Sequence, residues 1–426
     1  MKYSNFFIPT QNNVSSDVKM KSHELMIKSG MIRQETSGIY TWLPLGYRVL
    51  KKVIKIIENI HEQNNVNQIL MPTIQSSDIW KISDRYDSYG KEMLKIRDRH
   101  EKELLYGPTN EEMVTAIGKH YIKSYKSLPL KIFHVQNKFR DEIRPRFGVM
   151  RAREFIMKDA YSFDISDEES EKTYHIFYNL YLNIFEDLNM QVIPVRAPTG
   201  EIGGDLSHEF HLITDSGESE ILIKDDLINE DLSNLSLDQI LNIEAYTDDY
   251  YQKNNLTNNL NKFKSIELAH IFLFGTKYSN AFDFDVDSGD GKLKPFMGSY
   301  GIGISRIPAA FIESSHDERG IIWSKTLSPF DIHFINLLHD NSKCIQFCDK
   351  FYEESKNKNI DILLDDRKES AGKKFVDADL IGIPIQIICG NMYLKENKLS
   401  VIFRDEKNEQ QIHADKLFEF LLQHLK

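Results

Sequence analysis

The chain has 426 residues, enough for two or three domains. Its net charge of −11 argues against a generally basic nucleic-acid binder, although a local basic face can still contact nucleic acid. Its three cysteines, Cys344, Cys348 and Cys389, are too few for a disulfide framework, and no stretch is apolar for long enough to span a membrane. We therefore expect a cytoplasmic protein.

Two helices are expected near the amino terminus, over residues 22–36 and 47–63. Ser22 is the expected N-cap of the first helix. The second carries a wide apolar stripe at helical spacing, and a strand over 68–71 follows it and ends at Pro72. Such a stripe serves packing within a domain or a dimer interface, and the periodicity leaves both open.

The sequence LLYGPTNEEM, at residues 104–113, predicts a strand, a Gly-Pro turn and a helix with Thr109 as its N-cap. One interpretation is purely structural, with Glu111 beside the positive end of the helix. The other is chemical, because Thr109 and Glu111 could reach a cationic amine on a ligand.

The stretch Lys138–Asp164 is rich in arginine. Arg140 and Glu142 are two residues apart, so in a strand they would project from one face. Arg151 and Phe155 follow after a loop. Arginine matches phosphate oxygens, a carboxylate accepts from an exocyclic amine, and an aromatic ring stacks on a base. The stretch therefore suits a purine nucleotide, although a salt-bridged hairpin with a solvated tip remains an alternative.

An amphipathic helix is predicted over 167–188, followed over 200–213 by a glycine turn and a strand that carries His208 and His211. Three residues apart on a strand, these histidines point to opposite faces, so we expect no zinc site there. Residues 221–263 show weak helical periodicity and predict a small surface subdomain.

Residues 265–284 predict a strand and a turn, with Glu267 and His270 as polar insertions in the strand. Residues 296–313 join a glycine-rich strand to an apolar helix, with Arg306 at the junction. The glycines match neither a dinucleotide fingerprint nor a P-loop. Small residues in a strand favour a flat ligand against the backbone, with Arg306 on the ligand side.

From about Pro329 strands and helices alternate regularly, which predicts an independent α/β domain that ends in a helix over 413–426. We find no catalytic constellation in its sequence. Binding is therefore its expected role.

Three segments resemble motifs 1, 2 and 3 of the class II aminoacyl-tRNA synthetases. They are Pro72 after its helix and strand, Phe139-Arg140-x-Glu142 with Arg151 and Phe155 behind it, and Gly301-x-Gly303-x-x-Arg306. The strings GIYTWLPLG, GPTNEEM, GTKYS and YGIGISR extend the likeness. Nearly the whole chain is similar to bacterial prolyl-tRNA synthetases.

The resemblance implies an α+β catalytic domain with the antiparallel class II sheet over residues 1–325. It implies a C-terminal α/β anticodon-binding domain over 330–426 and a homodimer formed through motif 1. Many bacterial members carry a large editing domain where this chain has only residues 221–263. We therefore expect a short form that does not itself edit mischarged alanyl-tRNA.

The resemblance also implies roles at an ATP site. Arg140 and Arg306 are the implied catalytic residues. Arg140 grips the α-phosphate and the prolyl carboxylate, while Arg151 and Arg306 hold the γ-phosphate. Glu142 reads the adenine amine and Phe155 stacks on adenine.

The implied proline site uses Thr109 and Glu111 for the cationic imino nitrogen, with Phe272 closing over the ring. Glu267 stands where the class usually places a magnesium ligand, and His270 stands beside the nucleotide. L-Proline, ATP with Mg²⁺, and tRNA(Pro) are thus the implied substrates and cofactor.

Arg144 and Arg146, at the tip of the arginine-rich loop, are candidates for contacting the tRNA acceptor end. Two segments depart from the family pattern: Ala269 replaces a usual glycine, and Ser370-Ala371-Gly372 replaces a common Arg-Pro-Gly.

A sister threonyl enzyme and a non-catalytic synthetase-like paralogue are the alternatives. Threonyl enzymes hold zinc partly through a cysteine, and this chain has none before Cys344. A paralogue would be expected to lose its arginines, whereas Arg140, Arg151 and Arg306 are all present.

Overall fold

The computed structural model describes residues 1–15, 18–204 and 206–425. The chain forms two compact units. Unit 1 comprises Met1–Glu35, Tyr40–Lys52 and Phe311–Lys426, and unit 2 comprises Thr36–Ile39 and Val53–Ala310. Sequence reasoning grouped the first residues with the catalytic core, whereas the compact units group most of them with the carboxy-terminal residues.

Unit 2 is built on a nine-stranded sheet with the strand order β10-β9-β12-β11-β13-β16-β8-β7-β3. Its strands are β3 (Asn67–Gln68), β7 (Leu130–Phe139), β8 (Glu154–Asp164), β9 (Val192–Arg196), β10 (Leu206–Ile213), β11 (Ser219–Ile223), β12 (Tyr246–Thr247), β13 (Asn261–Leu273) and β16 (Phe296–Ile302). The central strands β13, β16, β8 and β7 pair antiparallel. Strand β10 also pairs with β13, so five strands at this end close on themselves.

A β-bulge in β13 matters for the site. Ala269 pairs with Phe210 and Glu267 pairs with His211, so Leu268 faces no partner on β10. Side chains three apart in a regular strand point to opposite faces. The extra residue shifts the alternation, and Glu267 and His270 consequently reach the same cavity.

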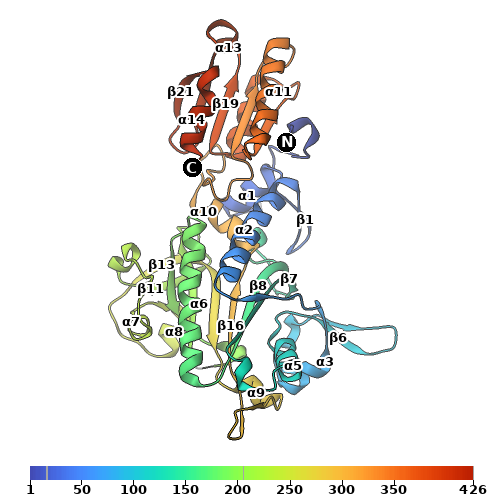
Figure 1. The fold of residues 1–426 in the computed structure, drawn as a ribbon, viewed down its shortest axis with the longest axis vertical. Helices are drawn as coiled ribbons and strands as arrows, with labels where there is room; N and C mark the ends of the chain where they lie inside the picture. The colour runs from blue at the N-terminus through green and yellow to red at the C-terminus, as the bar shows by residue number, and fades with distance from the viewer. Residues whose placement is uncertain (16–17, 205, 426) are drawn as a thin grey trace. The chain divides into compact units, whose positions relative to one another are not determined.

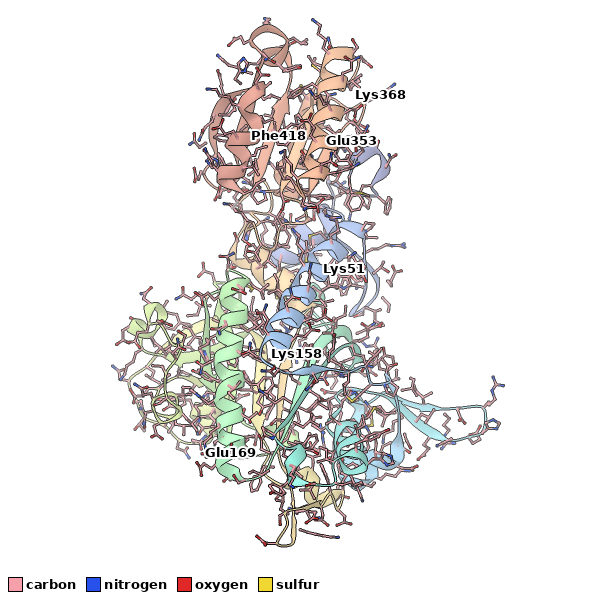
Figure 2. The ribbon with its side chains drawn as sticks, in the orientation of Figure 1. Lys51, Lys158, Glu169, Glu353, Lys368 and Phe418 are labelled. Atoms are coloured by element: carbon pink, nitrogen blue, oxygen red, sulfur yellow. The ribbon has the colours of Figure 1, made fainter. Side chains whose placement is uncertain are left out.

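Helix α6 (Asp167–Asp187) runs along β8, β13 and β16 (Figure 1). Ser166 caps it, accepting from the backbone N–H of Glu169, which lies at the start of the helix in Figure 2. Its aromatic face packs on the sheet, where Lys158 of β8 contacts the hydroxyl of Tyr181 and donates to a β16 carbonyl at 3.1 Å. This buried face fixes the central strands from behind.

A three-stranded sheet with the order β4-β6-β5 and three helices precede the hairpin β7–β8 in the chain. These elements are β4 (Ile74–Ser76), α3 (Ser77–Ile82), α4 (Arg85–Ser88), β5 (Lys95–Arg97), β6 (Glu103–Tyr106) and α5 (Glu111–Tyr121). Trp80, Met93 and Leu105 form their buried core. Helix α3 packs against both β6 and α5 (Figure 1).

Residues 221–263 contain short helices and also contribute strands to the sheet of unit 2. The segment contains α7 (Leu237–Leu241) and α8 (Asp248–Lys253), capped by Ser236 and Thr247. Its ends add β11 and the start of β13 to the sheet, which the weak periodicity did not predict. Elsewhere unit 2 contains α9 (Lys277–Ala281), β14 (Val286–Asp287) and β15 (Lys292–Leu293).

Unit 1 contains a five-stranded sheet with the order β18-β17-β19-β20-β21, parallel across its first three strands and antiparallel beyond. The elements are β17 (Ile332–Asn336), α11 (Ser342–Asn357), β18 (Ile362–Asp365), α12 (Ala371–Ile381), β19 (Ile385–Cys389), α13 (Asn391–Glu396), β20 (Lys398–Phe403), β21 (Asn408–His413) and α14 (Leu417–His424). The predicted β/α alternation is confirmed, but β21 was missed. The closing helix therefore begins later than expected.

The amino-terminal part of unit 1 contains α1 (Lys21–Lys28), β1 (Ile32–Thr36), β2 (Ile39–Trp42) and the start of α2 (Pro44–Gln63), and α10 (Arg306–Ser314) leads into its carboxy-terminal part. Lys2 forms a parallel bridge with Leu364 of β18, so the first residues extend that sheet. All three cysteines are buried free thiols in the core of this unit.

Several local predictions were wrong. The helix expected over residues 22–36 ends at Lys28, and Ile32–Thr36 forms strand β1 instead. Helix α1 begins after Met20, and Ser22 donates its backbone N–H to Glu313 instead of capping the helix. The N-cap of α5 is Asn110, because the hydroxyl of Thr109 turns to the carboxylate of Glu111. The strand expected over residues 68–71 is only the two-residue β3.

None of the described helices has the length and apolar character needed to cross a membrane.

Candidate active site

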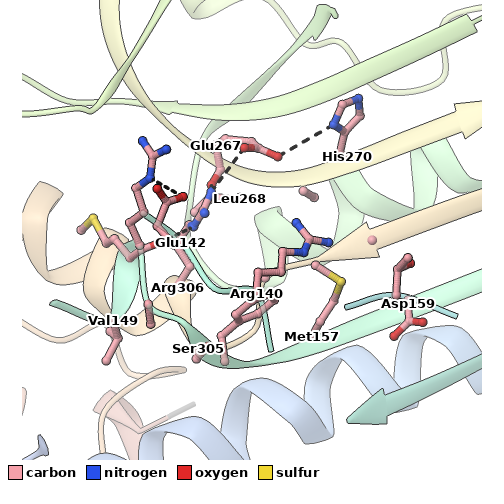
Figure 3. A pocket seen from close by; sticks show the side chains of 18 of the residues that line it. Arg140, Glu142, Val149, Met157, Asp159, Glu267, Leu268, His270, Ser305 and Arg306 are labelled. Carbon is pink, nitrogen blue, oxygen red and sulfur yellow. Dashed lines mark hydrogen bonds and ion pairs between the residues drawn. The ribbon is translucent and has the colours of Figure 1, made fainter. Parts of the chain in front are cut away.

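A cavity of about 400 Å³ opens on one face of the central sheet of unit 2 (Figure 3). Strands β8, β13 and β16, the link from β6 to α5 and the β7–β8 loop all contribute to its wall. Ten residues singled out in the sequence line it: Thr109, Glu111, Arg140, Glu142, Arg151, Phe155, Glu267, His270, Phe272 and Arg306. Arg144 and Arg146 lie exposed near the tip of the loop.

Arg140 lies just beyond the end of β7, which stops at Phe139. The expected strand geometry for Arg140 and Glu142 is therefore wrong, although both side chains reach the cavity. The guanidinium of Arg140 donates to the carbonyl oxygen of Pro108 at 3.3 and 3.4 Å and lies 5.4 Å from the centre of the Phe155 ring. The guanidinium therefore stands between the end of the cavity that Glu142 and Arg151 line and the end that Glu111 lines.

Glu142 and Arg151 form an ion pair across the β7–β8 loop, with 3.0 Å between Oε2 and Nε. The backbone N–H of Arg144 donates to the other carboxylate oxygen of Glu142 at 3.2 Å. Partial burial opposes ionisation, but these donors outweigh it and hold the pKa of Glu142 below its ordinary value. Both side chains keep contact with water, because 20% of Glu142 and 39% of Arg151 is exposed.

The turn between β1 and β2 holds the base of this loop. Gly38 accepts from the backbone N–H of Arg153 at 2.7 Å. Its φ is +73°, and an added Cβ would lie 2.7 Å from Cβ of Pro145. A side chain there would displace the loop, so the glycine is required by both conformation and space.

Arg306, at the start of α10, closes the far wall. Its Nε donates to the carbonyl of Met150 at 2.9 Å, and its Nη1 donates to the backbone carbonyl of Glu267 at 2.5 Å. The same Nη1 lies 3.4 Å from the Glu267 carboxylate. Gly301 leaves open space on the cavity floor, because an added Cβ would meet no atom closer than 3.7 Å.

His270 lies beside Glu267 as a consequence of the bulge. Its Nε2 is 2.6 Å from Oγ of Ser207, and its ring stacks on Phe272 with centroids 3.8 Å apart. Burial lowers the pKa of His270 to about 4, so the imidazole is neutral at pH 7.

Glu209 on β10 is a neighbour that sequence reasoning missed. One of its carboxylate oxygens lies 3.5 Å from Nδ1 of His270 and the other 2.7 Å from Nε2 of His211. Glu209, Glu267 and His270 each offer one possible metal-ligand atom within 4.8 Å of the others. His208 points elsewhere and contacts the Tyr174 hydroxyl on α6, so the two histidines of this strand lie apart as the alternation predicts.

The opposite end of the cavity is lined by buried side chains. Only 1% of the Glu111 side chain is exposed, and both carboxylate oxygens already have partners. Oε2 accepts from the Thr109 hydroxyl at 2.7 Å and lies 3.2 Å from Nη1 of Arg85, while Oε1 accepts from the Ser299 hydroxyl at 3.1 Å. Arg85 and Ser299 were not predicted, because nothing near them in the sequence points to Glu111.

A buried hydrogen-bond network around Asp159 adjoins this end of the cavity. Nζ of Lys138 donates to the side-chain oxygen of Asn110 at 2.7 Å and lies 3.2 Å from Asp159. The hydroxyl of Tyr161 donates to Asp159 at 2.6 Å and accepts from the backbone N–H of Asn110 at 3.1 Å. Burial opposes ionisation of Asp159, but Lys138 and His134 outweigh it and hold its pKa well below the ordinary range.

The chain is similar over most of its length to well-defined families. The family described as tRNA synthetase class II core domain (G, H, P, S and T) matches residues 92–315, and the one described as anticodon binding domain matches residues 331–424.

Among relatives, the proline–tRNA ligase of Bartonella tribocorum is 48% identical over 418 residues, covering 94% of this chain and 95% of the relative. That of Rickettsia rickettsii is 47% identical over 414 residues, covering 94% and 97%. The prolyl-tRNA synthetase of Cryptosporidium parvum, solved with halofuginone and AMPPNP, superposes with a TM-score of 0.77 at 18% identity, covering 95% of this chain and 76% of that one. The last likeness bears on the fold alone. The chain belongs to the proline–tRNA ligases of the class II aminoacyl-tRNA synthetases.

Proposed function

We propose that this protein activates L-proline with ATP and transfers the prolyl group to the 3′ end of tRNA(Pro). The observation that carries the proposal is the charge layout of the single cavity described above. A buried carboxylate, Glu111, lies at one end, arginines and an aromatic ring lie at the other, and Arg140 stands between them. A cationic amino acid nitrogen suits the first end and a nucleoside polyphosphate suits the second.

At the proline end, Glu111 and the Thr109 hydroxyl accept from the protonated imino nitrogen. Phe272 covers the apolar ring, which gains from contact with an aromatic face. The prolyl carboxylate then points toward Arg140, whose guanidinium binds it together with the α-phosphate.

At the ATP end, Phe155 stacks on adenine and Glu142 accepts from the adenine amine. Arg151 and Arg306 bind the γ-phosphate, with His270 as a neutral neighbour of the nucleotide. Since Arg151 is paired with Glu142 and Arg306 with Glu267, ATP binding exchanges these internal pairs for contacts with the ligand.

Activation forms one bond and breaks one. A carboxylate oxygen of proline bonds to the α-phosphorus, the bond from that phosphorus to the bridging oxygen breaks, and pyrophosphate leaves with the electron pair. The proline carboxylate is ionised at neutral pH, so no general base is needed. Arg140 and Arg306 stabilise the negative charge that gathers around phosphorus. The terminal ribose hydroxyl of tRNA then attacks the carbonyl carbon and gives its proton to a phosphate oxygen of the adenylate. The bond from the carbonyl carbon to the phosphate oxygen breaks, and AMP leaves with the electron pair.

The residues present fit a magnesium ion. Mg²⁺ is usually bound through one or two carboxylates together with substrate phosphates, and Glu267 faces the cavity with Glu209 nearby. Glu267 would hold the ion, which neutralises phosphate charge when bound. The neutral His270 adds no competing positive charge.

Three further assignments belong to the same proposal. Residues 1–325 carry aminoacylation and residues 330–426 bind the anticodon, in a cytoplasmic homodimer formed through motif 1. Arg144 and Arg146 contact the acceptor end of tRNA, because both are exposed on the loop that borders the cavity.

The protein does not itself edit alanyl-tRNA(Pro), since residues 221–263 form only two short α-helices, one 3₁₀ helix and pieces of the sheet. Incubation of the purified protein with Ala-tRNA(Pro) tests this. Deacylation above the spontaneous rate, without a second protein, would contradict it.

Pyrophosphate exchange tests the central proposal. Labelled pyrophosphate is incorporated into ATP only when an amino acid is activated, so proline is compared with threonine, alanine and serine. Exchange with proline is expected to exceed the others. Exchange with threonine but not proline would overturn the substrate assignment, and exchange with none would favour a non-catalytic paralogue.

A further inference from the structure

Arg85, the first residue of α4, is buried behind the proline end of the cavity. Only 3% of its side chain is exposed. Its guanidinium carbon lies 5.0 Å from the ring centre of Trp80, 5.6 Å from that of Tyr89 and 5.9 Å from that of Tyr278. This aromatic enclosure holds the cation in one place.

One nitrogen of Arg85 makes all of its polar contacts. Nη1 lies 3.2 Å from Oε2 of Glu111, 3.0 Å from Oε1 of Glu112 and 2.9 Å from the hydroxyl of Tyr278. Among the described residues, Nε and Nη2 of Arg85 and Oε2 of Glu112 have no hydrogen-bond partner. A buried ion pair with unsatisfied atoms is a poor source of stability, which points to a functional reason for the cluster.

The charges in this cluster do not balance. One guanidinium faces two carboxylates, and 1% or less of each carboxylate is exposed. Glu111 lines the cavity and has further donors in Thr109 and Ser299, whereas Glu112 points away from it and accepts from the Ser83 hydroxyl at 2.7 Å. Burial and the nearby Glu111 raise the pKa of Glu112 to about 7, in opposition to Arg85.

We propose that Arg85 is a positioning residue for amino acid recognition, which holds the Glu111 carboxylate aimed into the cavity and balances the charge of the second buried carboxylate, Glu112. This inference rests on the proposed function, in which Glu111 meets the cationic nitrogen of proline. Without Arg85, two adjacent buried carboxylates would face each other with no counter-charge between them and would repel. Glu111 would also lose the contact that fixes its direction, so the cationic nitrogen of the substrate would find its partner out of place.

The test measures KM for proline and for ATP by pyrophosphate exchange in Arg85→Gln, Arg85→Lys, Glu112→Gln and the double variant Arg85→Gln/Glu112→Gln. Arg85→Gln is expected to raise KM for proline by about 30-fold or more and to change KM for ATP by less than about threefold. Arg97→Gln, at an exposed position of β5, is the matched control and should match the wild type.

Two rescues separate this role from a merely structural one. Lysine carries three donors on one nitrogen, so Arg85→Lys is expected to keep KM for proline within about fivefold of the wild type. The double variant removes the carboxylate of Glu112 together with the guanidinium of Arg85, so Glu111 no longer faces a second carboxylate. It is expected to regain at least about tenfold of the affinity lost in Arg85→Gln.

Equal rises in KM for proline and ATP, or a double variant no better than Arg85→Gln, would overturn the inference. If circular dichroism shows that Arg85→Gln does not fold, the double variant is compared with Glu112→Gln instead. If the double variant also fails to fold, Arg85→Lys is compared with the wild type. In either comparison, a KM for proline within about fivefold supports the inference and a larger rise overturns it. Failure of the proposed function is distinguishable, because the wild type itself would then show no exchange with proline.

Discussion

The two ends of the cavity are built from the same kinds of side chain in opposite surroundings. At the proline end, Glu111 and Arg85 are paired with almost no exposure to water. At the ATP end, Glu142 and Arg151 form a pair of similar length, 3.0 Å against 3.2 Å, but 39% of the arginine is exposed. A buried pair is already desolvated and fixed before any ligand arrives, whereas a half-exposed pair can separate at little cost.

This difference suits the two substrates. A small amino acid has few groups to recognise, so a rigid and dry carboxylate discriminates by charge and position. A nucleoside triphosphate offers many oxygens, and arginines that exchange one partner for another can follow it as it binds. Substitutions at the buried proline end should therefore change the exchange kinetics more than substitutions at the more exposed ATP end. Substitution of Arg140, which serves both ends, should change them most.

Replacing Arg140 by alanine should abolish adenylation while the fold stays intact. Its guanidinium is the one cation assigned to both the prolyl carboxylate and the α-phosphate, so kcat/KM in pyrophosphate exchange is expected to fall at least about 1000-fold. Circular dichroism and the melting temperature should match those of the wild type. Near-normal exchange would refute the role given to Arg140.

The loop tip supplies the control for that experiment. Arg144→Ala/Arg146→Ala removes two arginines from the same loop at exposed positions. Exchange, which needs no tRNA, should stay within about twofold of the wild type, while KM for tRNA in charging should rise about tenfold and depend less on salt. Loss of exchange in the double variant would mean that the loop acts as a single unit.

Glu111→Gln is expected to raise KM for proline about 100-fold and to leave KM for ATP nearly unchanged. The substitution removes the charge and leaves Arg85 without one of its two counter-ions in a dry site. Exchange kinetics with each substrate varied in turn measure the effect. A rise in KM for ATP alone would mean that Glu111 belongs to the ATP end of the cavity and that the two ends have been assigned the wrong way round.

Arg151→Ala should have a smaller effect, because the side chain is more than one third exposed and its partner Glu142 can be solvated when it leaves. KM for ATP is expected to rise about 10- to 30-fold, with KM for proline unchanged. A rise in KM for ATP as large as the rise in KM for proline in Glu111→Gln would contradict the contrast between the exposed and the buried end.

The sequence predicted α6 and the turn into α10, because their periodicities are long and regular. The hairpin β7–β8 entered only as the alternative interpretation of the arginine-rich stretch, and the strand β7 before Lys138 was not predicted. The sequence could not predict the bulge at Leu268, which exists only through the pairing of β13 with β10. Glu267 and His270 were therefore named as polar insertions without any reason for them to share a face. Residue roles came from the family resemblance and not from the spacing.

Arg85 was missed for a related reason. It lies in a polar stretch whose pattern indicates a surface, and the sequence contains no sign that Trp80, Tyr89 and Tyr278 surround it. Tyr278 is 193 residues away along the chain. Contacts of this kind arise from the tertiary fold, which local patterns do not encode.

The surplus carboxylate gives the proline end a measurable pH dependence. Glu112 is faced by Arg85, Glu111 and Tyr278, and burial raises its pKa from the ordinary 4.5 to about 7. The folded protein thus retains a proton that the unfolded chain has lost, so the contribution of Glu112 to stability falls as the pH rises from 4.5 to 7. The Glu112→Gln variant lacks the titrating carboxyl group and therefore lacks this loss of stability.

The stability of Glu112→Gln relative to the wild type is therefore expected to increase by about 1.5 kcal/mol between pH 5.5 and pH 7. Urea unfolding at each pH measures the difference, and the buried histidines cancel because they are common to both proteins. Glu62→Gln, at an exposed position of α2, is the control and should show no such trend. A constant difference across this range would mean that Glu112 stays ionised, and Arg85 would then balance both carboxylates without any proton being shared.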